Sequence, residues 1–320
     1  MKAAIFTKYG PPAVVQIKEI NKPGPKANEV LIKVHASTVN RTDCGFRSAE
    51  YFVSRFFTGL FKPRFQILGN EFAGEIEEIG SAVTTFKKGD KVFGFMDDAC
   101  GGHAEYMTIA EHKGLTTMAE GMSFEDATLL TEGSHYALCN IRAAKVQPGQ
   151  KVLVNGGTGA IGSAAIQILK YFDAHVTAVC ATPHLELVKS LGADKLIDYT
   201  QKDFTQTDEK YDFIFDAVGK SSFGKCKPLL NKNGIYISTE LGKNGENIWL
   251  ALFTPIFGGK KLLFPLPAIT KADVVFLKQL AEAGKFKPVI DRTYDLAHIV
   301  DAYSYVEKGM KIGNVVIKVS

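Results

Sequence analysis

Short runs of alternating apolar and polar residues fill the first part of the chain. The clearest of these runs are AAIF (3–6), EVLIKVHAS (29–37), FAGEIEEIG (72–80) and DKVFGF (90–95). Turn residues separate them, at residues 23–25 (Pro-Gly-Pro) and 88–90 (Lys-Gly-Asp). A period of two bounded by such turns is typical of half-buried strands. The pattern therefore predicts an antiparallel, barrel-like lobe.

From about residue 150 the pattern changes to apolar strands that alternate with helices. KVLVNG, HVTAVC and KLID have strand length, and the segments AIGSAAIQILKYF and PHLELVKSLG between them have helical spacing. YDFIFDAVG (211–219) and GIYIST (234–239) continue the series. Such alternation predicts βαβ units and a parallel sheet, so the fold class is α/β. The end of the chain, a helix and a β-branched strand, returns to the style of the first lobe.

Length and composition narrow the class of protein. A chain of 320 residues with 46% apolar and 22% charged residues is ordinary for a globular protein and long enough for two lobes. A net charge of +4 does not by itself indicate nucleic-acid binding. The five cysteines are scattered singly, which predicts reduced thiols in a cytoplasmic protein. We expect no signal peptide and no membrane span, and we place the most apolar stretch, IWLALFTPIFGG (248–259), in the core or in a subunit contact.

A glycine-rich loop follows the strand KVLV and precedes a helix. Its glycines have the spacing G-x-G-x-x-G, in which the first makes the tight turn and the second lets the backbone approach a pyrophosphate. The third lets helix and strand pack closely, and the helix N-terminus offers N–H groups to the phosphates. The alternative is a glycine-rich turn without a ligand. We predict a dinucleotide site formed by Gly157, Thr158, Gly159, Ala160, Ile161 and Gly162.

The end of the second strand favours NADPH over NADH. NAD-binding proteins usually carry an acidic residue there, which bonds the ribose 2′-OH, but residues 174–185 contain none. Cys180 is small enough to leave room for a 2′-phosphate, and Tyr199 could stack near the adenine. Donors to that phosphate are available in Thr182, His184 and Lys189. A second interpretation, compatible with the first, is that Thr182 caps the next helix and the following proline occupies its first turn.

Six motifs occur in one order over nearly the whole chain: ILGNEFAG, VTTFKKGDKVFG, GGHAEYMTIAEHK, VQPGQKVLVNGGTGAIGSAAIQ, LGADKLIDY and YDFIFDAVG. With this order and spacing the chain resembles the medium-chain dehydrogenase/reductase superfamily, and within it the zinc-free NADPH-dependent quinone oxidoreductase branch. The resemblance implies a GroES-like catalytic domain built from residues 1–124 and 266–320, and a Rossmann NADP-binding domain at residues 125–265. It also implies cofactor contacts at Val218 and Gly219, and a dimer or tetramer through the edge of the Rossmann sheet, with KKLLFPL (260–266) as the edge strand.

The resemblance also predicts that a catalytic zinc is missing. Metal-dependent relatives carry a Cys three residues before an Asp, and a His in a G-H-E motif. Here Asn40 precedes Asp43 at that offset, and Asn70 takes the place of the His. Neutral amides are poor zinc ligands compared with thiolate and imidazole. The four-cysteine structural zinc lobe is absent as well, because that part of the chain holds only Cys100.

Without a metal to polarise an alcohol or a simple ketone, hydride transfer to an electron-poor acceptor is the easier reaction. Quinones and α,β-unsaturated carbonyls are such acceptors. By the resemblance, Asn40 could bond a substrate oxygen, and Asn70 and Glu71 would lie beside it. Glu71 is either a pocket carboxylate or a structural anchor held by local hydrogen bonds.

Two further residues are candidates for contact with the reacting groups. Tyr51 lies in SAEYFVSRFFTGLFKPRF (48–65), where aromatic and basic residues interleave, and it could donate a proton, although water could serve instead. We interpret this segment as an aromatic lid over the substrate cleft, with a core helix as the alternative. In EGSHYAL, His135 takes the place of the family's Thr near the nicotinamide. It could reach the carboxamide, act as an acid or serve a structural role.

The function predicted from the sequence is a zinc-independent, NADPH-dependent reductase that transfers hydride to quinones or α,β-unsaturated carbonyls. One alternative is a non-catalytic NADPH-binding protein, such as a sensor, a crystallin or an RNA-binding protein, which the aromatic and basic segment 48–65 would support. A further alternative is an alcohol dehydrogenase with substituted zinc ligands. We expect a small-molecule substrate and a homodimer, and neither a membrane nor a nucleic acid as partner. The acceptor, the proton donor and the number of electrons moved stay open.

Overall fold

The computed structural model describes residues 1–50, 55–96 and 98–320, so the predicted site residue Tyr51 lies outside the described residues. The chain divides into two compact units. The first unit comprises Met1–Glu132, Ile269–Glu282 and Pro288–Ser320, and the second comprises Gly133–Ala268 and Ala283–Lys287. The limits predicted from the sequence are residues 124 and 265, a few residues before the points at which the backbone changes unit.

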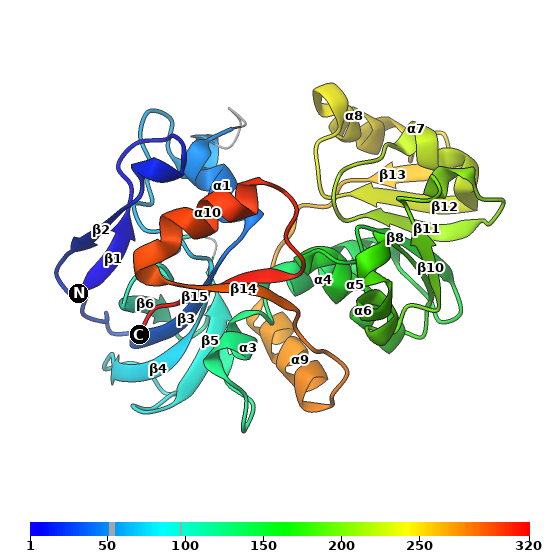
Figure 1. Cartoon of the computed structure of the whole chain (residues 1–320). Coiled ribbons are helices and arrows are strands. Elements are labelled where there is room, and N and C mark those ends of the chain that lie inside the picture. Colours follow the sequence, from blue (N-terminus) through cyan, green and yellow to red (C-terminus); the bar gives the residue numbers. More distant parts are fainter. Residues whose placement is uncertain (51–54, 97) are drawn as a thin grey trace. The chain divides into compact units, whose positions relative to one another are not determined.

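A seven-stranded sheet forms the first unit (Figure 1). Its strands pair antiparallel except for the parallel pair β14–β15, and they run in the order β14 (Ile290–Asp295), β15 (Asn314–Lys318), β3 (Glu29–Val39), β4 (Glu71–Ile79), β5 (Lys91–Phe95) and β7 (Gly114–Thr117), with β6 (Tyr106–Ala110) paired to β3. β1 (Lys2–Ile5) and β2 (Gln16–Glu19) form a separate hairpin. The apolar residues that alternate along β3 and β4, such as Val30, Ile32 and Phe72, fill the interior of this sheet. Both ends of the chain thus build one unit.

Helices close the open sides of the first sheet. They are α1 (Arg41–Ser48), α2 (Arg55–Thr58), α3 (Phe124–Thr128), α9 (Lys271–Glu282) and α10 (Ile299–Glu307), with short 3-10 turns η1 (Pro12–Val14) and η7 (Leu296–His298). Helix α10 buries Ile299, Ala302, Tyr303 and Val306. Their spacing of three and four residues places them on one helical face, which packs against β15 and α1.

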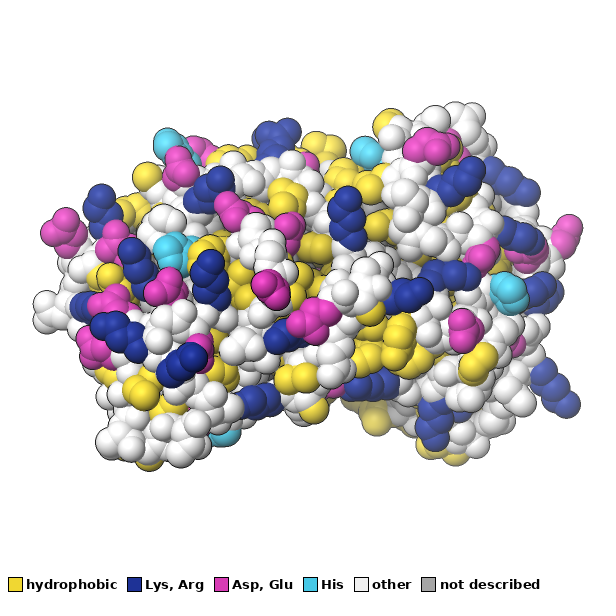
Figure 2. Space-filling model, turned by 90° about the horizontal axis from the view of Figure 1, so that it is seen from below, with side chains coloured by type: hydrophobic (Ala, Val, Ile, Leu, Met, Phe, Trp, Pro, Cys, Tyr) yellow, Lys and Arg dark blue, Asp and Glu magenta, His cyan; other side chains and the backbone are white. Residues whose placement is uncertain are grey.

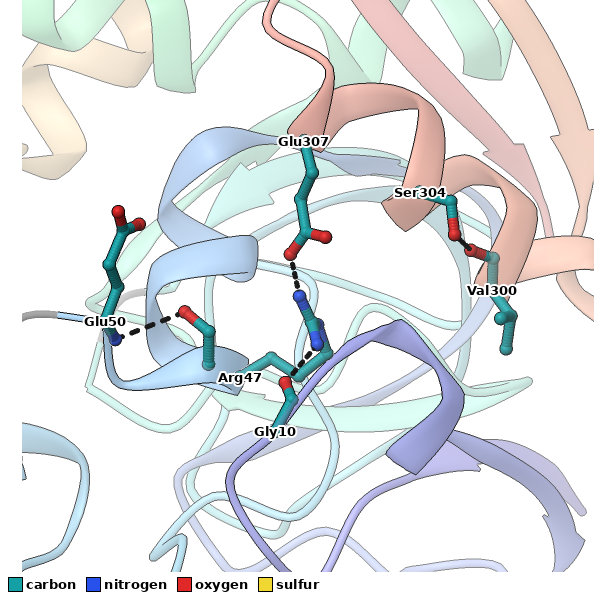
Figure 3. A network of polar contacts seen from close by, with 7 residues as sticks. Gly10, Arg47, Glu50, Val300, Ser304 and Glu307 are labelled. Carbon is teal, nitrogen blue, oxygen red and sulfur yellow. Dashed lines mark hydrogen bonds and ion pairs between the residues drawn. The ribbon is translucent and has the colours of Figure 1, made fainter.

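Arg47 is fully buried near the end of α1 and joins three segments of the first unit (Figure 3). Its Nη1 donates to the carbonyl oxygen of Gly10, and its Nη2 pairs with the carboxylate of Glu307 on α10. The guanidinium carbon lies 5.1 Å from the ring centroid of Tyr303. This buried cation therefore links α1, α10 and the loop that follows β1.

The second unit is a doubly wound sheet of six parallel strands. The order is β10 (Lys195–Asp198), β9 (His175–Cys180), β8 (Lys151–Asn155), β11 (Tyr211–Asp216), β12 (Leu230–Ser238) and β13 (Lys261–Leu263). Numbered along the chain this is 3-2-1-4-5-6, the Rossmann order. The order of the strands reverses between β8 and β11, and ligands of such sheets bind at this point, beyond the carboxyl ends of the strands.

Helices lie on both faces of the parallel sheet, with α5 and α6 on one side and α7 and α8 on the other (Figure 1). The helices and 3-10 turns are α4 (Glu132–Ala144), α5 (Ala160–Tyr171), η3 (Thr182–His184), α6 (Leu185–Ser190), η4 (Phe204–Gln206), α7 (Phe223–Cys226), η5 (Lys227–Leu229), η6 (Lys243–Gly245) and α8 (Glu246–Phe253). The predicted strands and helices of this unit are confirmed. Thr182 is not a cap, however: it is the first residue of η3, and Ala181 precedes it as the N-cap.

Two apolar segments differ from the core interpretation given by the sequence. In α8, Trp249, Leu252 and Phe253 are exposed, and Phe257 just beyond the helix is 83% exposed. These side chains do not belong to the core of this chain, which leaves the subunit contact as their predicted role. In the segment that follows α2, Phe61 is 90% exposed. No helix in the described part of the chain has both the length and the apolar character needed to cross a membrane.

Candidate functional site

The glycine loop lies between β8 and α5, at the carboxyl edge of the parallel sheet. Gly156 has a φ of +85°, which a residue with a side chain rarely adopts. A Cβ at Gly162 would lie 2.0 Å from the Gly156 carbonyl oxygen, so only glycine allows α5 to pack this closely on the loop. A Cβ at Gly157 would lie 3.1 Å from Ile166 Cδ1 and 3.3 Å from the Cβ of Ala178. These contacts fold the loop tightly against the sheet.

Gly159 differs from the other glycines of the loop because the space beside it is open. A Cβ there would meet no atom of the chain closer than the Gly156 carbonyl oxygen at 3.7 Å. Gly159 is also the N-cap of α5 and supplies no side-chain cap, so the first N–H groups of this helix point to the loop without a side-chain acceptor. Open backbone at the positive end of a helix fits a pyrophosphate. The residues present therefore fit a dinucleotide.

The tip of β9 carries an acidic neighbour that the sequence interpretation missed. Cys180 is buried, and Asp198 at the end of β10 pairs with it in register. The hydroxyl of Thr182 donates to Asp198 Oδ2 at 2.5 Å, and the hydroxyl of Thr200 donates to Asp198 Oδ1 at 2.7 Å. The hydrogen bond from Thr182 contributes most to lowering the pKa of Asp198 below its ordinary value. The absence of acids from residues 174–185 therefore does not make this tip free of carboxylates.

The remaining predicted cofactor residues lie around the same edge of the sheet. The N–H of Tyr199 donates to the carbonyl oxygen of Cys180 at 3.1 Å, and the Tyr199 side chain is 57% exposed. A Cβ at Gly156 would lie 2.3 Å from Val218 Cγ1, so Val218 closes the loop from the side of β11. Gly219 follows with a φ of +63°. His184 is half-buried in η3, and Lys189 is exposed on α6.

Asn40 lies in the first unit, at the junction of β3 and α1. Its Oδ1 accepts from the N–H of Asp43 at 2.9 Å, and the Asp43 carboxylate accepts from the N–H of Asn40 at 3.1 Å. This capping box starts α1. The Nδ2 of Asn40 donates to Glu132 Oε2, and it lies 3.5 Å from the hydroxyl of Thr38. Both the oxygen and the nitrogen of the Asn40 amide, which is predicted to bond a substrate oxygen, thus have hydrogen-bond partners within the chain.

Glu71 begins β4 and is almost completely buried. Its Oε2 accepts from the hydroxyl of Thr38 at 2.7 Å. Its Oε1 accepts from the hydroxyl of Thr131 at 2.8 Å and from the N–H of Glu132 at 2.6 Å. Three donors therefore stabilise the carboxyl group, which favours the structural-anchor interpretation of Glu71. They also bring it next to the segment that carries Glu132.

Burial dominates the electrostatics of this carboxyl cluster. It raises the pKa of Glu132 well above its ordinary value, and the charges of Glu71 and Asp43 raise it further. Burial also raises the pKa of Glu71, against the donors just described, and that of Asp43 from 3.8 to about 7. The half-buried Lys311 has its pKa lowered by burial and raised by Glu132 and Glu71. Burial therefore favours the protonated forms of these three carboxyl groups, compared with exposed carboxyl groups.

Asn70, which the resemblance sets where metal-dependent relatives carry a His, is completely buried. Its Oδ1 accepts from the thiol of Cys100 at 3.0 Å, and its Nδ2 has no hydrogen-bond partner among the described residues. Gly69 before it has a φ of +88°, and a Cβ there would lie 2.6 Å from the ring of His103. Outside residues 51–54 and 97, no three His, Cys, Asp or Glu side chains are arranged to hold a metal ion. The amide oxygens of Asn40 and Asn70 both accept hydrogen bonds from other groups of the chain, the N–H of Asp43 and the thiol of Cys100. Amide oxygens bonded in this way do not fit a set of zinc ligands.

His135 lies on α4 in the second unit and is buried, with its ring centroid 4.5 Å from that of Tyr136.

The residues around Asn40 include three that were not candidates in the sequence: Glu132, Thr131 and Lys311. Together with Asn40, Thr38 and Glu71 they form what we call the Asn40 cluster. The sequence signal for Glu132 was an acidic residue directly before the glycine of EGSHYAL.

The fold and these sites are those of the two-domain dehydrogenases and reductases. Residues 26–137 match the family model described as an alcohol dehydrogenase GroES-like domain, and residues 191–317 match the one described as a zinc-binding dehydrogenase. A chloroplast envelope quinone oxidoreductase homologue from Arabidopsis thaliana is 32% identical over 99% of this chain and 98% of its own length. An NADPH-dependent alkenal/one oxidoreductase from the same plant is 30% identical, over 99% of this chain and 79% of its own length.

Among solved structures, the quinone oxidoreductase from Coxiella burnetii superposes with a TM-score of 0.89 at 28% identity, covering 100% of this chain and 99% of that one. The chain belongs to the medium-chain dehydrogenase/reductase superfamily, in its quinone oxidoreductase-like branch. The predicted combination of a GroES-like domain with a Rossmann domain is confirmed.

Proposed function

We propose that this chain is a zinc-independent reductase that uses NADPH to reduce quinones or α,β-unsaturated carbonyls. The names of its relatives, a quinone oxidoreductase homologue and an alkenal/one oxidoreductase, support this choice of acceptor. The observation that carries the proposal is the loop of Gly156 to Gly162, with its open space at Gly159 and the uncapped start of α5. In the overall reaction NADPH, a proton and a quinone would give NADP⁺ and a hydroquinone.

The cofactor, when bound, supplies the hydride, and the chain supplies binding and orientation. The glycine loop and the first N–H groups of α5 would hold the pyrophosphate. Val218 and Gly219 would border the loop, and Tyr199 would lie near the adenine. Asn40 would donate to an oxygen of the acceptor through the amide hydrogen that faces Thr38 only at 3.5 Å.

Three other predicted residues keep a proposed role. Asn70 has a buried amide nitrogen without a partner in the described part of the chain, so it has a donor to offer to a ligand. His135 would approach the carboxamide of the nicotinamide, and Tyr51 would be the proton donor if water does not serve. Substituting Asn70 by Ala should raise the KM for the acceptor and leave that for NADPH unchanged. An unchanged acceptor KM would assign Asn70 a structural role only.

The preference for NADPH over NADH depends on the side chains at the tip of β9. Thr182, His184 and Lys189 lie near the tip of β9 and would contact a 2′-phosphate. Asp198 accepts a hydrogen bond from Thr182 and opposes that phosphate by its charge. Steady-state kinetics with each cofactor decide the point, and a lower kcat/KM with NADPH than with NADH would contradict it.

The experiment that tests the function combines an acceptor panel with a matched pair of variants. Oxidation of NADPH should proceed with phenanthrenequinone, benzoquinone or alkenals, and a metal chelator should not slow it. Gly159→Ala should raise the Kd for NADPH without loss of thermal stability, because its Cβ meets only the open space. The control is Gly224→Ala, whose Cβ would lie 3.9 Å from the nearest atom, the Ser222 hydroxyl oxygen. No turnover with any acceptor, or equal NADPH binding by both variants, would refute the proposal.

We further propose a cytoplasmic homodimer that forms through the edge of the parallel sheet. β13 is the last strand of that sheet, and its free edge could pair with a second copy. The exposed apolar side chains of α8, with Phe257 beyond it, lie in the segment directly before this strand and would be buried by the same contact. Sedimentation of wild type and of Trp249→Lys tests this, since the variant should shift toward monomer.

The alternative of a non-catalytic RNA-binding protein is not favoured by the relatives. On the face shown in Figure 2, Lys and Arg side chains are interspersed with Asp and Glu side chains. This face therefore offers no broad surface of one sign along which a phosphate backbone could lie.

A further inference from the structure

Glu132 is buried, and its carboxyl group accepts hydrogen bonds from the side chains of Asn40 and Thr42. We propose that Glu132 is a positioning residue, which holds the Asn40 amide in the orientation that donates to the substrate oxygen. This inference rests on the proposed function, in which Asn40 is the substrate contact.

The orientation of the Asn40 amide follows from its two partners. Its oxygen faces a donor, the N–H of Asp43 at 2.9 Å, and its nitrogen faces an acceptor, Glu132 Oε2. A flipped amide would set its nitrogen against the N–H of Asp43, a donor against a donor in any protonation state of Glu132. Its oxygen would face Glu132 Oε2, and this contact would be repulsive as well unless Oε2 carried a proton. Glu132 thus selects one of two otherwise similar amide orientations, and it leaves one N–H of Asn40 for a ligand.

Glu132 is itself fixed from two sides. Its Oε1 accepts from the hydroxyl of Thr42 at 2.6 Å, on the same helix turn that Asn40 caps. Its backbone N–H donates to Glu71 Oε1 at 2.6 Å, and Glu71 is in turn held by Thr38 and Thr131. The orientation of Asn40 therefore depends on the end of β3 and on the starts of α4 and β4.

The charge of Glu132 affects how well Asn40 can serve. The ionisable groups that face Glu132 are Glu71 on β4, Asp43 on α1 and Lys311 before β15. Hydride transfer to a conjugated acceptor places negative charge on its oxygen, and a second negative charge one hydrogen bond away opposes this. A neutral Glu132 with its proton on Oε1 avoids that repulsion and still accepts from the Asn40 amide at Oε2. Burial favours the neutral form by raising the pKa of Glu132.

The first test compares Glu132→Gln, Glu132→Leu and, as a control, Glu120→Gln at an exposed position. In the wild type kcat should decline at high pH, because an ionised Glu132 opposes the negative charge that develops on the substrate oxygen. The Gln variant keeps an acceptor for Asn40 but cannot ionise, so it should retain kcat and lack this decline. The Leu variant removes the acceptor and should lower kcat by roughly 10- to 100-fold, the worth of one hydrogen bond to a charged or strongly polar group. Its Kd for NADPH should match wild type. A Leu variant with wild-type kcat, or a Gln variant with an unchanged pH profile, would overturn the proposal.

The second test does not need turnover. In protein labelled with ¹⁵N-asparagine, Asn40→Ser identifies the side-chain NH₂ resonances of Asn40. The shift of these resonances with pH should be smaller in Glu132→Gln than in the wild type, because only the titration of Asp43 remains beside Asn40. In Glu132→Leu the resonances should move toward the averaged position of a free amide. Resonances that stay in place in the Leu variant contradict the positioning role. If the wild type reduces no acceptor, the proposed function fails, while this measurement still decides the role of Glu132.

Discussion

Acidification from about pH 7 to about pH 4 should weaken the first unit through one buried imidazole, that of His103. The ring is 1% exposed, its Nε2 lies 2.6 Å from the Thr38 carbonyl oxygen, and its Nδ1 lies 3.3 Å from the Tyr303 hydroxyl. One neutral tautomer satisfies both contacts, with Nε2–H donating to the carbonyl and Nδ1 accepting from the tyrosine. Burial lowers the pKa of His103 from 6.5 to about 4, and the bond to Thr38 offsets this only in part.

The size of the effect follows from that difference in pKa. Because the pKa of the folded state lies below that of the unfolded chain, the unfolded chain binds the proton first. The stabilisation is present above about pH 6.5 and is lost as the pH falls toward 4. At about 1.4 kcal/mol per pKa unit, the loss reaches roughly 3 kcal/mol. Asp43 acts in the opposite direction, because burial raises its pKa from 3.8 to about 7, and its contribution grows as the pH falls through that range.

In the wild type, His103 and Asp43 change the unfolding free energy in opposite directions as the pH falls. The effect of His103 must therefore be measured as the difference in unfolding free energy between the wild type and a variant. In His103→Gln the amide replaces the Nε2–H donor but leaves the Tyr303 hydroxyl without its acceptor, which should cost about 1–3 kcal/mol at neutral pH. The difference in unfolding free energy between wild type and variant should then shrink by about 3 kcal/mol between pH 7 and pH 4. At the low end of this range the variant should equal or exceed the wild type.

Urea unfolding followed by far-UV circular dichroism at closely spaced pH values provides the data. The transition of the first unit is the one that His103→Gln shifts at neutral pH, and His112→Gln at an exposed position is the matched control. A difference between wild type and His103→Gln that stays constant from pH 7 to pH 4 would refute the reasoning, because it would mean that burial does not keep this imidazole neutral.

Three further predictions concern other parts of the chain. Arg47→Met should lower the unfolding free energy by about 2–4 kcal/mol in urea melts, since the link between α1 and α10 is lost, whereas Glu307→Gln, whose side chain is 33% exposed, should cost less than about 1 kcal/mol; equal costs would contradict this. Gly162→Ala should weaken NADPH binding and lower the melting temperature together, because its Cβ would lie 2.0 Å from the Gly156 carbonyl oxygen; a stable variant would argue against the tight loop. Asp198→Asn should lower the KM for NADPH several-fold without lowering that for NADH, and steady-state kinetics with a minimal effect on both would remove Asp198 from the cofactor site.

The sequence predicts the second unit well because its signals are local. A buried strand, a glycine loop and an amphipathic helix follow one another within residues 151–171, and the contact that requires glycine at position 162, with the Gly156 carbonyl oxygen, lies inside that segment. The place of Asp198 beside Cys180, in contrast, cannot be predicted from neighbouring residues in the sequence. It depends on the register between β9 and β10, which sets it opposite Cys180. Parallel strands end at one edge of a sheet, so a comparison of the ends of the predicted strands could have found this acid.

The Asn40 cluster was beyond the reach of local signals for a different reason. Its side chains come from the end of β3, the start of β4, the residues just before and at the start of α4, and the turn before β15. Each residue alone is ordinary in its own segment: Asn40 is a good helix cap, and Thr131 and Glu132 precede a glycine. The apolar pattern of α8 left the core and a subunit contact open as alternatives, because an apolar run has the same sequence pattern whether the core or a second copy of the chain covers it.

The same cluster explains how a site with amides in the metal-ligand places keeps its buried carboxyl groups. Glu71 receives three donors and Glu132 two, so neither acid is left without hydrogen bonds in the protein interior. Amides at positions 40 and 70 suit such a site, because an amide offers donor and acceptor at once, whereas a thiolate or an unprotonated imidazole nitrogen would offer a further acceptor to acids that need donors. Replacing Asn40 by Cys should therefore not restore a zinc site. It should raise the pKa of Glu132 further, since the donor to Oε2 is lost.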